Sequence, residues 1–331
     1  MEKNAIKKFA VWAREDLIKR VSAKAEEYGV SKDKPADPNA ESVSGRLLND
    51  TEKKQRRALI EKVGKDGYEQ VIEEVAYTWF NRFIALRFME ANNYLPSHVR
   101  VFTDENNAFE PQILTEALHI ELDGLSRDKV ISFKQDNKTD ELYKYLIITQ
   151  CNALNSVLPK MFQRINDYTE LLFPDNIRRE GSVLEQMITL IPEEDWKDQV
   201  QIIGWLYQYY NSALKDRVFA DLKKNIKISK KDIPAATQLF TPDWIVRYMV
   251  ENSLGRTVIN ALTYGSHSND DKAKAENLRL NWKYYLDEAP QNEEVTAELC
   301  KIEKDRYSSG ESFVDTRACS HKSLDKQVKK C

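Results

Sequence analysis

The chain has 331 residues, a formal net charge of −3 at pH 7, and 31% charged residues. Its length allows two domains of ordinary size, and its 10% aromatic content excludes a disordered chain, which lacks the bulky side chains that a core needs. No apolar run approaches the roughly 20 residues of a membrane-spanning helix, and no apolar signal segment follows the first residues, MEKN. We therefore expect a cytoplasmic protein without a membrane partner.

Charge and cysteine usage disfavour two further classes of protein. A dedicated nucleic-acid binder is often basic throughout, whereas this chain has 53 acidic and 50 basic residues, so any DNA contact has to come from local basic clusters. The cysteines Cys151, Cys300, Cys319 and Cys331 form no Cys-x-x-Cys pair, and no second ligand pair accompanies Cys319 and His321. We therefore expect no metal site.

The low glycine and proline content, ten residues of each, favours helices. The first predicted helix covers 5–28, with Gly29 as its C-cap. Residues 30–49 hold two prolines and several Ser, Asp and Asn, and predict a loop. The buried face of the first helix is predicted from the helical spacing of Ile6, Phe9, Ala10, Ala13, Leu17, Val21 and Ala25.

The rest of the first domain is also predicted to be helical. A charged helix should run from Asp50 to about Val63 and be broken by Gly64 and Gly67. The helix predicted over 68–91 is apolar over more than one face, which is typical of a helix surrounded by others. A tight apolar corner is expected at 171–175, and a short strand at Ser312–Asp315. Further helices are predicted over 111–122, 139–158, 181–191 and 195–224, with Ser182 or Gly181 capping the third.

The strongest basic cluster is KKNIKISKK at 223–231. Such a cluster can follow a phosphate backbone, but no aromatic residue is interleaved for stacking on bases. We interpret it as part of a solvated linker over 225–236. The linker would join a helical N-terminal domain over 1–224 to a second domain that begins at 237.

One motif, TQLFTPDWIVRYMV at 237–250, has a distinct helix start. Pro242 fits the first turn of a helix, which makes Thr241 the predicted N-cap, and Leu239 and Phe240 should pack back on that helix. Free N–H groups at such a start can receive a carboxylate or a phosphate, although the pattern taken alone favours a capped structural helix. The predicted buried stripe is Ile245, Val246, Met249 and Val250.

Residues 238–250 resemble the pattern Gln-Phe-Tyr/Phe-Thr-Pro-x-x-Ile/Val-Val-x-x-Met of gamma-class adenine-N6 DNA methyltransferases. Further blocks are similar to one branch of that family, the BREX phage-exclusion methyltransferases of PglX type. The resemblance extends from residue 4 to about residue 309. The blocks are NAIKKFA at 4–10, AYTWFNRF at 76–83, IGWLYQYY at 203–210, NSLGR at 252–256 and WKYYL at 282–286.

The resemblance implies a mainly α chain with a helical N-terminal domain. After it would come the first helix and the first strand of an incomplete Rossmann-like α/β methyltransferase domain over 237–315. Phe240, Thr241 and Pro242 would line the methionine end of the cofactor, S-adenosylmethionine. The substrate would be double-stranded DNA, methylated on adenine N6, and the partners would be other proteins of a phage-defence system.

The sequence departs from this family in its catalytic motifs. No glycine follows Gly310, so the glycine-rich loop that lets the backbone approach the cofactor cannot be recognised. The Asn-Pro-Pro-Tyr motif, which holds the flipped adenine, is also absent, because the chain has no Asn-Pro and no Pro-Pro. We therefore expect an N-terminal piece, truncated before the catalytic motifs, with an aberrant tail over 316–331, no catalytic residue and no activity of its own.

Two other interpretations remain open. A non-catalytic helical module would hold partner proteins or contact DNA phosphates, although acidic neighbours favour solvated helix faces at the candidate cations. A decayed product without function would expose apolar surface and aggregate. The candidate phosphate contacts on the first two helices are Arg14, Lys19, Arg20, Lys53, Lys54, Arg56 and Arg57.

Overall fold

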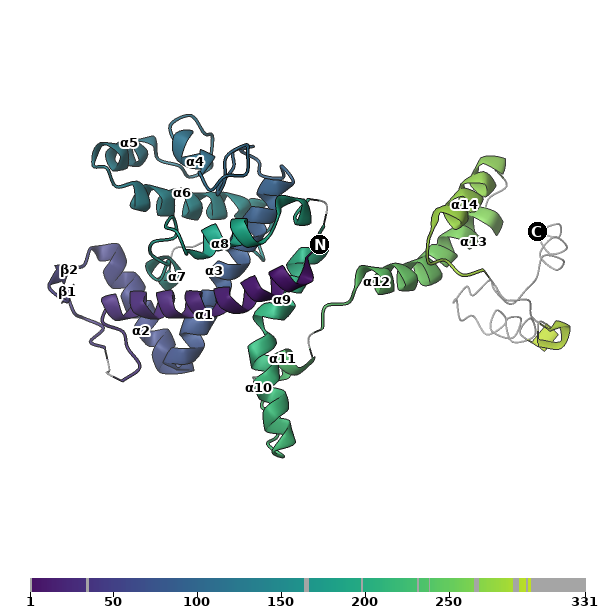
Figure 1. The fold of residues 1–331 in the computed structure, drawn as a ribbon, viewed down its shortest axis with the longest axis horizontal. Coiled ribbons are helices and arrows are strands. Elements are labelled where there is room, and N and C mark those ends of the chain that lie inside the picture. The colour runs from purple at the N-terminus through teal and green to yellow at the C-terminus, as the bar shows by residue number, and fades with distance from the viewer. Residues whose placement is uncertain are drawn as a thin grey trace, which may run out of the picture. The chain divides into compact units, whose positions relative to one another are not determined.

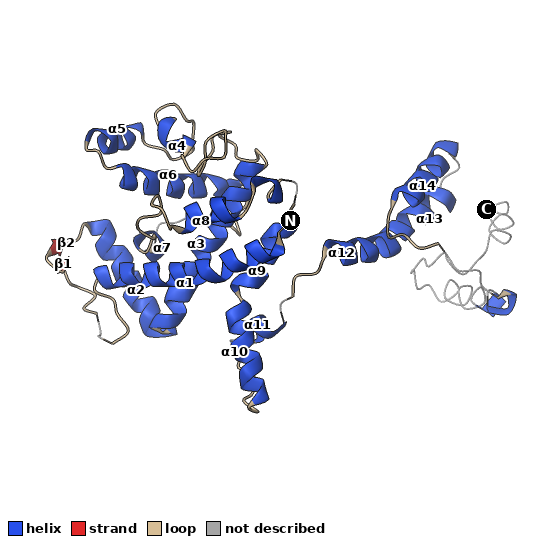
Figure 2. Cartoon of the chain, in the orientation of Figure 1, coloured by secondary structure: helices blue, strands red, loops and turns tan. Residues whose placement is uncertain are grey.

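The computed structural model describes residues 2–33, 36–163, 167–197, 199–230, 232–237, 239–264, 268–287, 292–295 and 297–298. The chain divides into two compact units, one ending at Phe240 and the other beginning at Thr241. Helices make up both units (Figures 1 and 2), so the predicted mainly α class is confirmed. The predicted strand at 312–315 and the predicted tail at 316–331 lie outside the described residues.

Residues 225–237 belong to the first unit, because α10 (Ser212–Lys223) packs against α11 (Ile233–Thr237). The functional domain bounds 1–224, 225–236 and 237–315 stay predictions. In the described ranges, strand pairing is limited to an antiparallel hairpin of β1 (Ser42–Val43) and β2 (Arg46–Leu47), inside the segment predicted to be a loop.

Helix α1 (Lys3–Glu27) packs against α3 (Tyr68–Ala91), α8 (Val183–Leu190) and α9 (Gln201–Tyr210). All seven residues predicted for its buried face are buried. Gly29 follows the helix with a φ of +67° and donates its N–H to the carbonyl of Glu26, as a C-terminal glycine does. The predicted register of this helix is therefore confirmed.

Helix α2 (Asp50–Asp66) starts with a capping box, in which the Asn49 side chain accepts from the Glu52 N–H and the Glu52 carboxylate accepts from the Asn49 N–H. The prediction that Gly64 breaks this helix was wrong: Gly64 is exposed and a Cβ there would meet nothing within 4 Å. An exposed helical glycine costs only about 0.5–1 kcal/mol relative to alanine. Gly67, with a φ of +90°, separates α2 from α3.

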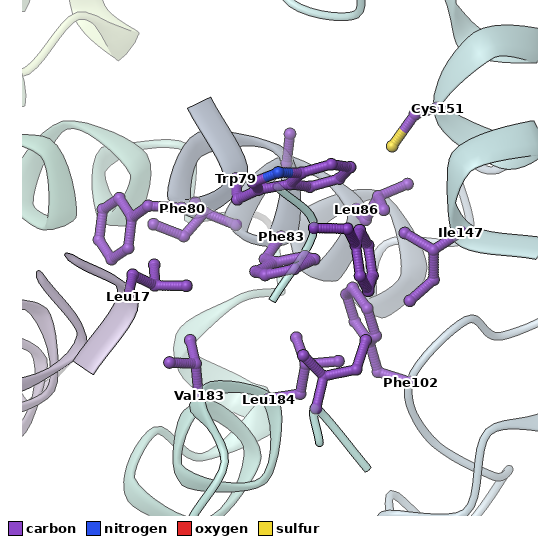
Figure 3. Close-up of a cluster of buried hydrophobic side chains, with 14 of the residues drawn as sticks. Leu17, Trp79, Phe80, Phe83, Leu86, Phe102, Ile147, Cys151, Val183 and Leu184 are labelled. Carbon is purple, nitrogen blue, oxygen red and sulfur yellow. The ribbon is translucent and has the colours of Figure 1, made fainter. Parts of the chain in front are cut away.

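The core of the first unit surrounds α3, which has the predicted bounds. Trp79 packs edge-on against Phe173, with ring centroids 4.6 Å apart, and Phe83 packs edge-on against Phe102. Figure 3 shows the α3 side chains among those of several other elements, with Leu17 from α1, Ile147 and Cys151 from α6 (Thr139–Ala153), and Val183 and Leu184 from α8. Burial of α3 on more than one face confirms the predicted central helix.

The remaining predicted helices are shorter than expected. Residues 111–122 hold only the single turn α4 (Gln112–Thr115), while α5 (Arg127–Gln135), capped by Ser126, was not predicted. Asn211 divides the helix predicted over 195–224 into α9 and α10, because its side-chain amide bonds the Tyr207 carbonyl. Helix α8 begins after Ser182 as predicted, and the short elements are η1 (Leu154–Ser156), α7 (Tyr168–Leu171) and η2 (Glu193–Asp195).

The second unit contains α12 (Asp243–Val250), one π-helical turn η3 (Glu251–Gly255), α13 (Arg256–Tyr264) and α14 (Asn269–Asn281), with α13 packed against α14. The side-chain amide of Asn252 forms two hydrogen bonds with the backbone of the segment after α14. It donates to the Tyr284 carbonyl (2.7 Å) and accepts from the Leu286 N–H (2.8 Å). Glu251 accepts the Tyr284 N–H and Arg256 donates to the Leu286 carbonyl. These hydrogen bonds hold the segment that follows α14 against η3 and the start of α13.

An ionic network is buried beside α3. The guanidinium of Arg87, which is 0% exposed, donates to Glu90 (2.6 Å) and Glu193 (3.3 Å). The other oxygen of Glu90 accepts the N–H groups of Val101 and Phe102. The network therefore fixes the chain after α3 against α3 itself. Breaking a buried pair leaves an uncompensated charge, which is costly.

We predict that Arg87→Gln lowers the free energy of unfolding by about 3–5 kcal/mol, because it leaves buried carboxylates short of a cation. Arg178→Gln is the control, since Arg178 forms a half-exposed pair with Asp140 and should change that free energy by no more than about 1 kcal/mol. Urea unfolding at 25 °C measures both. Equal effects of the two substitutions would show that the buried network contributes nothing special.

The Cys151 thiol provides a second test of the core. The residue is fully buried, and burial raises the pKa of its thiol to about 12, so the thiolate is scarce at pH 8. We predict that iodoacetamide leaves Cys151 unmodified in the native protein at pH 8 and alkylates it after unfolding in guanidinium chloride. Mass spectrometry of the peptide that carries Cys151 measures this, and rapid alkylation of the native protein would contradict the described core.

Candidate cofactor-binding segment

The three predicted cofactor-binding residues lie in the connection between α11 and α12. Phe240 is half-buried and is the last residue of the first unit. Thr241 is exposed, and Pro242 is half-buried directly before α12. The three are adjacent in the chain, and their role in binding S-adenosylmethionine stays a prediction.

Phe240 packs on the outer face of α9, in a contact site formed by Gly204, Trp205 and Gln208 that we call the seat. Its ring contacts that of Trp205 edge-on, with centroids 5.2 Å apart and planes at 69°. A Cβ on Gly204 would come within 2.0 Å of the Phe240 ring, so the ring needs a glycine at this position. The Phe240 N–H donates to the side-chain oxygen of Gln208 (2.8 Å). Positions 204 and 208 are one helical turn apart and hold the ring and the backbone of Phe240 together.

Further contacts within the first unit fix the position of Trp205 and of α9. Lys3 at the start of α1 places its Nζ 4.4 Å from the centroid of the Trp205 ring, within the range of a cation–π contact. Trp205 also stacks on Tyr209, with centroids 5.8 Å apart. The opposite side of α9 is fixed in the core by its buried residues Ile202, Leu206 and Tyr210.

Several local predictions about this motif were wrong. The N-cap of α12 is Pro242 instead of Thr241, and no side chain caps the helix. The ψ of Pro242 is 144°, which is extended backbone, so the helix begins one residue later than predicted. Within the first unit, Phe240 packs on α9 and Leu239 is 64% exposed; the packing of these two residues on the helix that follows them stays a prediction.

The predicted buried stripe of α12 is largely exposed. Val246, Met249 and Val250 are 44%, 60% and 48% exposed, and no residue of α12 is buried within the described part of the second unit. At the start of the helix, the Asp243 carboxylate pairs with Arg247 (2.7 Å), which offsets its charge there. The amphipathic pattern was read correctly, but a pattern cannot tell whether a covering partner is present.

Some of the candidate DNA-contacting residues are exposed, and others are buried or paired. Lys223, Lys224, Lys227 and Lys230 are exposed, as expected for a solvated segment. Arg56, by contrast, is 3% exposed and donates to the carbonyls of Tyr28 and Asp37, so it cannot contact phosphate. Both candidate arginines on the first helix form ion pairs, Arg14 with Glu73 and Arg20 with Asp16.

Two expected absences can be examined only over the described ranges. Within these ranges no three His, Cys, Asp or Glu side chains are grouped closely enough to hold a metal ion. The described helices also include none with the length and apolarity that crossing a bilayer requires.

Sequence reasoning missed Gly204 and Gln208 as the residues that hold Phe240. A usable signal was present, because a lone glycine inside a helical apolar pattern often marks a close approach of another group. Gly204 stands inside the block IGWLYQYY at 203–210, which was noted only for its resemblance. The pattern does not identify the approaching group, which is 36 residues later in the chain, counted as 240 minus 204.

No protein-family model matches the chain. Over 332 aligned residues it is 40% identical to the adenine-specific methyltransferase PglX of Lacticaseibacillus casei (strain Zhang), a match that covers 91% of this chain and 27% of that protein. Over 321 residues it is 37% identical to the adenine-specific methyltransferase BrxX of Escherichia coli O9:H4 (strain HS), with 91% and 25% covered. These matches confirm the predicted resemblance, and the chain spans about a quarter of the length of these curated relatives.

We predict that Gly204→Ala releases Phe240, because the new methyl group would occupy the place of the ring. Hydrogen exchange of the peptide that covers 239–241 should then become faster, since the Phe240 N–H loses Gln208 as its acceptor. Gly64→Ala is the matched control at a helical glycine with open space around it. It should leave this exchange unchanged and raise the free energy of unfolding by about 0.5–1 kcal/mol. Unchanged exchange in Gly204→Ala would contradict the seat.

Proposed function

We propose that this chain is the helical part of an adenine-specific DNA methyltransferase that uses S-adenosylmethionine, and that it holds the cofactor-binding segment 240–242 in place. The observation that carries the proposal is the seat of Phe240 on Gly204, Trp205 and Gln208. This segment is the one that resembles the cofactor motif, and both relatives are named as adenine-specific methyltransferases.

The residues of the segment suit the methionine end of the cofactor. The exposed Thr241 hydroxyl can donate a hydrogen bond, and α12 presents the N–H groups of its first turn directly after Pro242. Both kinds of group favour a carboxylate, and the pairing of Asp243 with Arg247 reduces the repulsion from the acidic side chain at this position. When bound, S-adenosylmethionine would supply the methyl group.

The seat fixes Phe240, the first residue of the segment 240–242. A ring that is held by Gly204 and a backbone N–H that is held by Gln208 restrict Phe240 before any ligand arrives. Restricting a binding segment in advance lowers the entropy cost of ligand binding. We infer that the helical domain contributes to cofactor binding through this restriction, with Phe240, Thr241 and Pro242 as the contact residues.

The wider setting is part of the same proposal. Double-stranded DNA would be the substrate, other proteins of a phage-defence system the partners, and the cytoplasm the location. The chain alone would not transfer methyl groups, because its sequence lacks the Asn-Pro-Pro-Tyr motif that holds a flipped adenine and a recognisable glycine-rich loop. Its contribution to methyl transfer would be structural, and the reaction would require a neighbouring domain that carries the catalytic motifs.

Methyl transfer to duplex DNA tests the proposal. This chain alone, incubated with unmethylated DNA and labelled S-adenosylmethionine, should give no incorporation above background. A chimera of the L. casei relative, in which the matching region is replaced by this chain's residues, should methylate adenine. Gly204→Ala in the chimera should lower the rate by up to about 100-fold, since small misplacements near a reacting centre have effects of that size.

The chimera with Gly64→Ala is the control and should keep the full rate. Methylation by the chain alone would refute a purely supporting role. Equal rates for the Gly204→Ala and Gly64→Ala chimeras would show that the seat of Phe240 has no part in the reaction.

A further inference from the structure

A second feature of the first unit is the far end of α10 together with the chain that follows it. Helix α10 contacts α9 and α11, and its far end extends away from the other helices of the unit (Figure 1). We call residues 219–230 the α10 tip. Every residue from 222 to 230 is exposed, so this surface is open to another molecule.

The α10 tip carries positive charge that the described residues do not neutralise. Four lysines stand there against one carboxylate, that of Asp221. Lysines near a helix end favour its last carbonyl groups, which accounts for two of the four, whereas the other two lie beyond the helix. The lysines, none of which forms an ion pair with a described residue, are Lys223, Lys224, Lys227 and Lys230.

Apolar side chains are exposed among these lysines. Phe219 and Leu222 are 43% and 38% exposed, and their spacing of three residues places them on the same face of α10. Ile226 and Ile228, in the chain that follows, are 52% and 39% exposed. A single exposed apolar residue is ordinary, but a group of them bordered by polar residues is typical of a contact surface.

Hydrogen bonds give the α10 tip a defined shape. Asn225, with a φ of +60°, follows α10 as a left-handed residue, and the Ile226 N–H bonds a carbonyl of the last helical turn (3.0 Å). Farther along, the Asp232 carboxylate accepts from the Ser229 hydroxyl and from Arg217 of α10. The chain after α10 is thus tied to that helix at both ends, and a surface that is shaped in advance loses less entropy on binding.

We propose that the α10 tip binds an acidic segment of a partner protein that also carries apolar side chains. The lysines pair with its carboxylates, and Phe219, Leu222 and Ile226 are buried by its apolar residues. Apolar contacts in the centre with charged groups around them are the usual composition of a protein interface, and opposite charges select the partner. The inference does not rest on the proposed methyltransferase role, because the tip includes none of residues 240–242.

Duplex DNA fits the α10 tip less well than a polypeptide does. Phosphates would pair with the lysines, but backbone contacts of this kind leave the apolar side chains in water. Unpaired bases would need aromatic rings for stacking, and Phe219 is the one aromatic residue between 219 and 230. The exposed apolar side chains therefore decide between the two kinds of partner.

Fluorescence anisotropy with the full chain tests the inference. The probe is a fluorescein-labelled amphipathic peptide of glutamate and leucine at helical spacing. The comparison probes are the same peptide with serine in place of leucine, the same peptide with lysine in place of glutamate, and a labelled DNA duplex. The chain should bind the glutamate–leucine peptide, bind the serine peptide at least about tenfold more weakly, since apolar burial is lost, and not bind the lysine peptide.

Added salt should weaken the glutamate–leucine peptide only in part, because salt screens the charges and leaves the apolar contacts. No binding of this peptide, equal binding of the serine peptide, or tighter binding of the DNA duplex would overturn the assignment. A dimer of the chain that Ile226→Ser abolishes would overturn it as well, because the tip would then bind a second copy.

Charge reversal locates the binding surface. Lys223→Glu combined with Lys227→Glu should weaken the glutamate–leucine peptide more than tenfold, because two attractions become repulsions. Lys7→Glu combined with Lys8→Glu is the matched control at two exposed lysines of α1 and should leave the affinity within about twofold. Both variants change the net charge equally, so equal affinities would refute a site at the α10 tip.

An apolar substitution tests the second part of the interface. Ile226→Ser should weaken the glutamate–leucine peptide about tenfold, because the exposed half of its side chain is no longer buried by the partner. Leu47→Ser, at a leucine of β2 that is 78% exposed, is the control and should keep the wild-type affinity. Neither side chain belongs to the core, so both variants should melt close to the wild type. Wild-type affinity in Ile226→Ser would refute the apolar anchor.

Discussion

The packing of α9 against α1 is the contact on which the position of Phe240 depends. The buried side of α9 joins the core of the first unit through Ile202, Leu206 and Tyr210. Its outer side carries Gly204 and Gln208, which hold Phe240. A shift of α9 along α1 would therefore move Phe240, the first residue of the segment proposed to bind the cofactor.

Helix α9 has only ten residues and can hold Phe240 only because contacts with other elements fix its position. Asn211 ends it by bonding the Tyr207 carbonyl, and Lys3 lies over Trp205 from the start of α1. Isolated helices of this length are marginal in water, so tertiary contacts must supply its stability. The position of Phe240 thus depends on the whole helical core, although its direct contacts come from a single turn.

The sequence predicted the helices whose signal is local. Helical spacing gave the buried face of α1 and the bounds of α3, and Ser182 marked the start of α8. It failed where a side chain or a contact distant in the chain decides the outcome. Asn211 interrupts a continuous apolar pattern, and within the described part of the second unit the apolar side of α12 is exposed although its spacing indicates burial. The seat of Phe240 was not predictable because it joins residues from two separate motifs.

The side-chain bonds from the π-helical turn to the segment after α14 have a consequence for evolution. Asn252 and Tyr284 are 32 residues apart in the chain, and α13 and α14 lie between them as an excursion. Because the two ends of this excursion are tied together, its length can vary without moving the residues on either side. Doubling such a loop costs only about 0.6 kcal/mol in closure entropy. Insertions and deletions should therefore accumulate between α13 and α14, while the residues that tie the ends together tolerate few replacements.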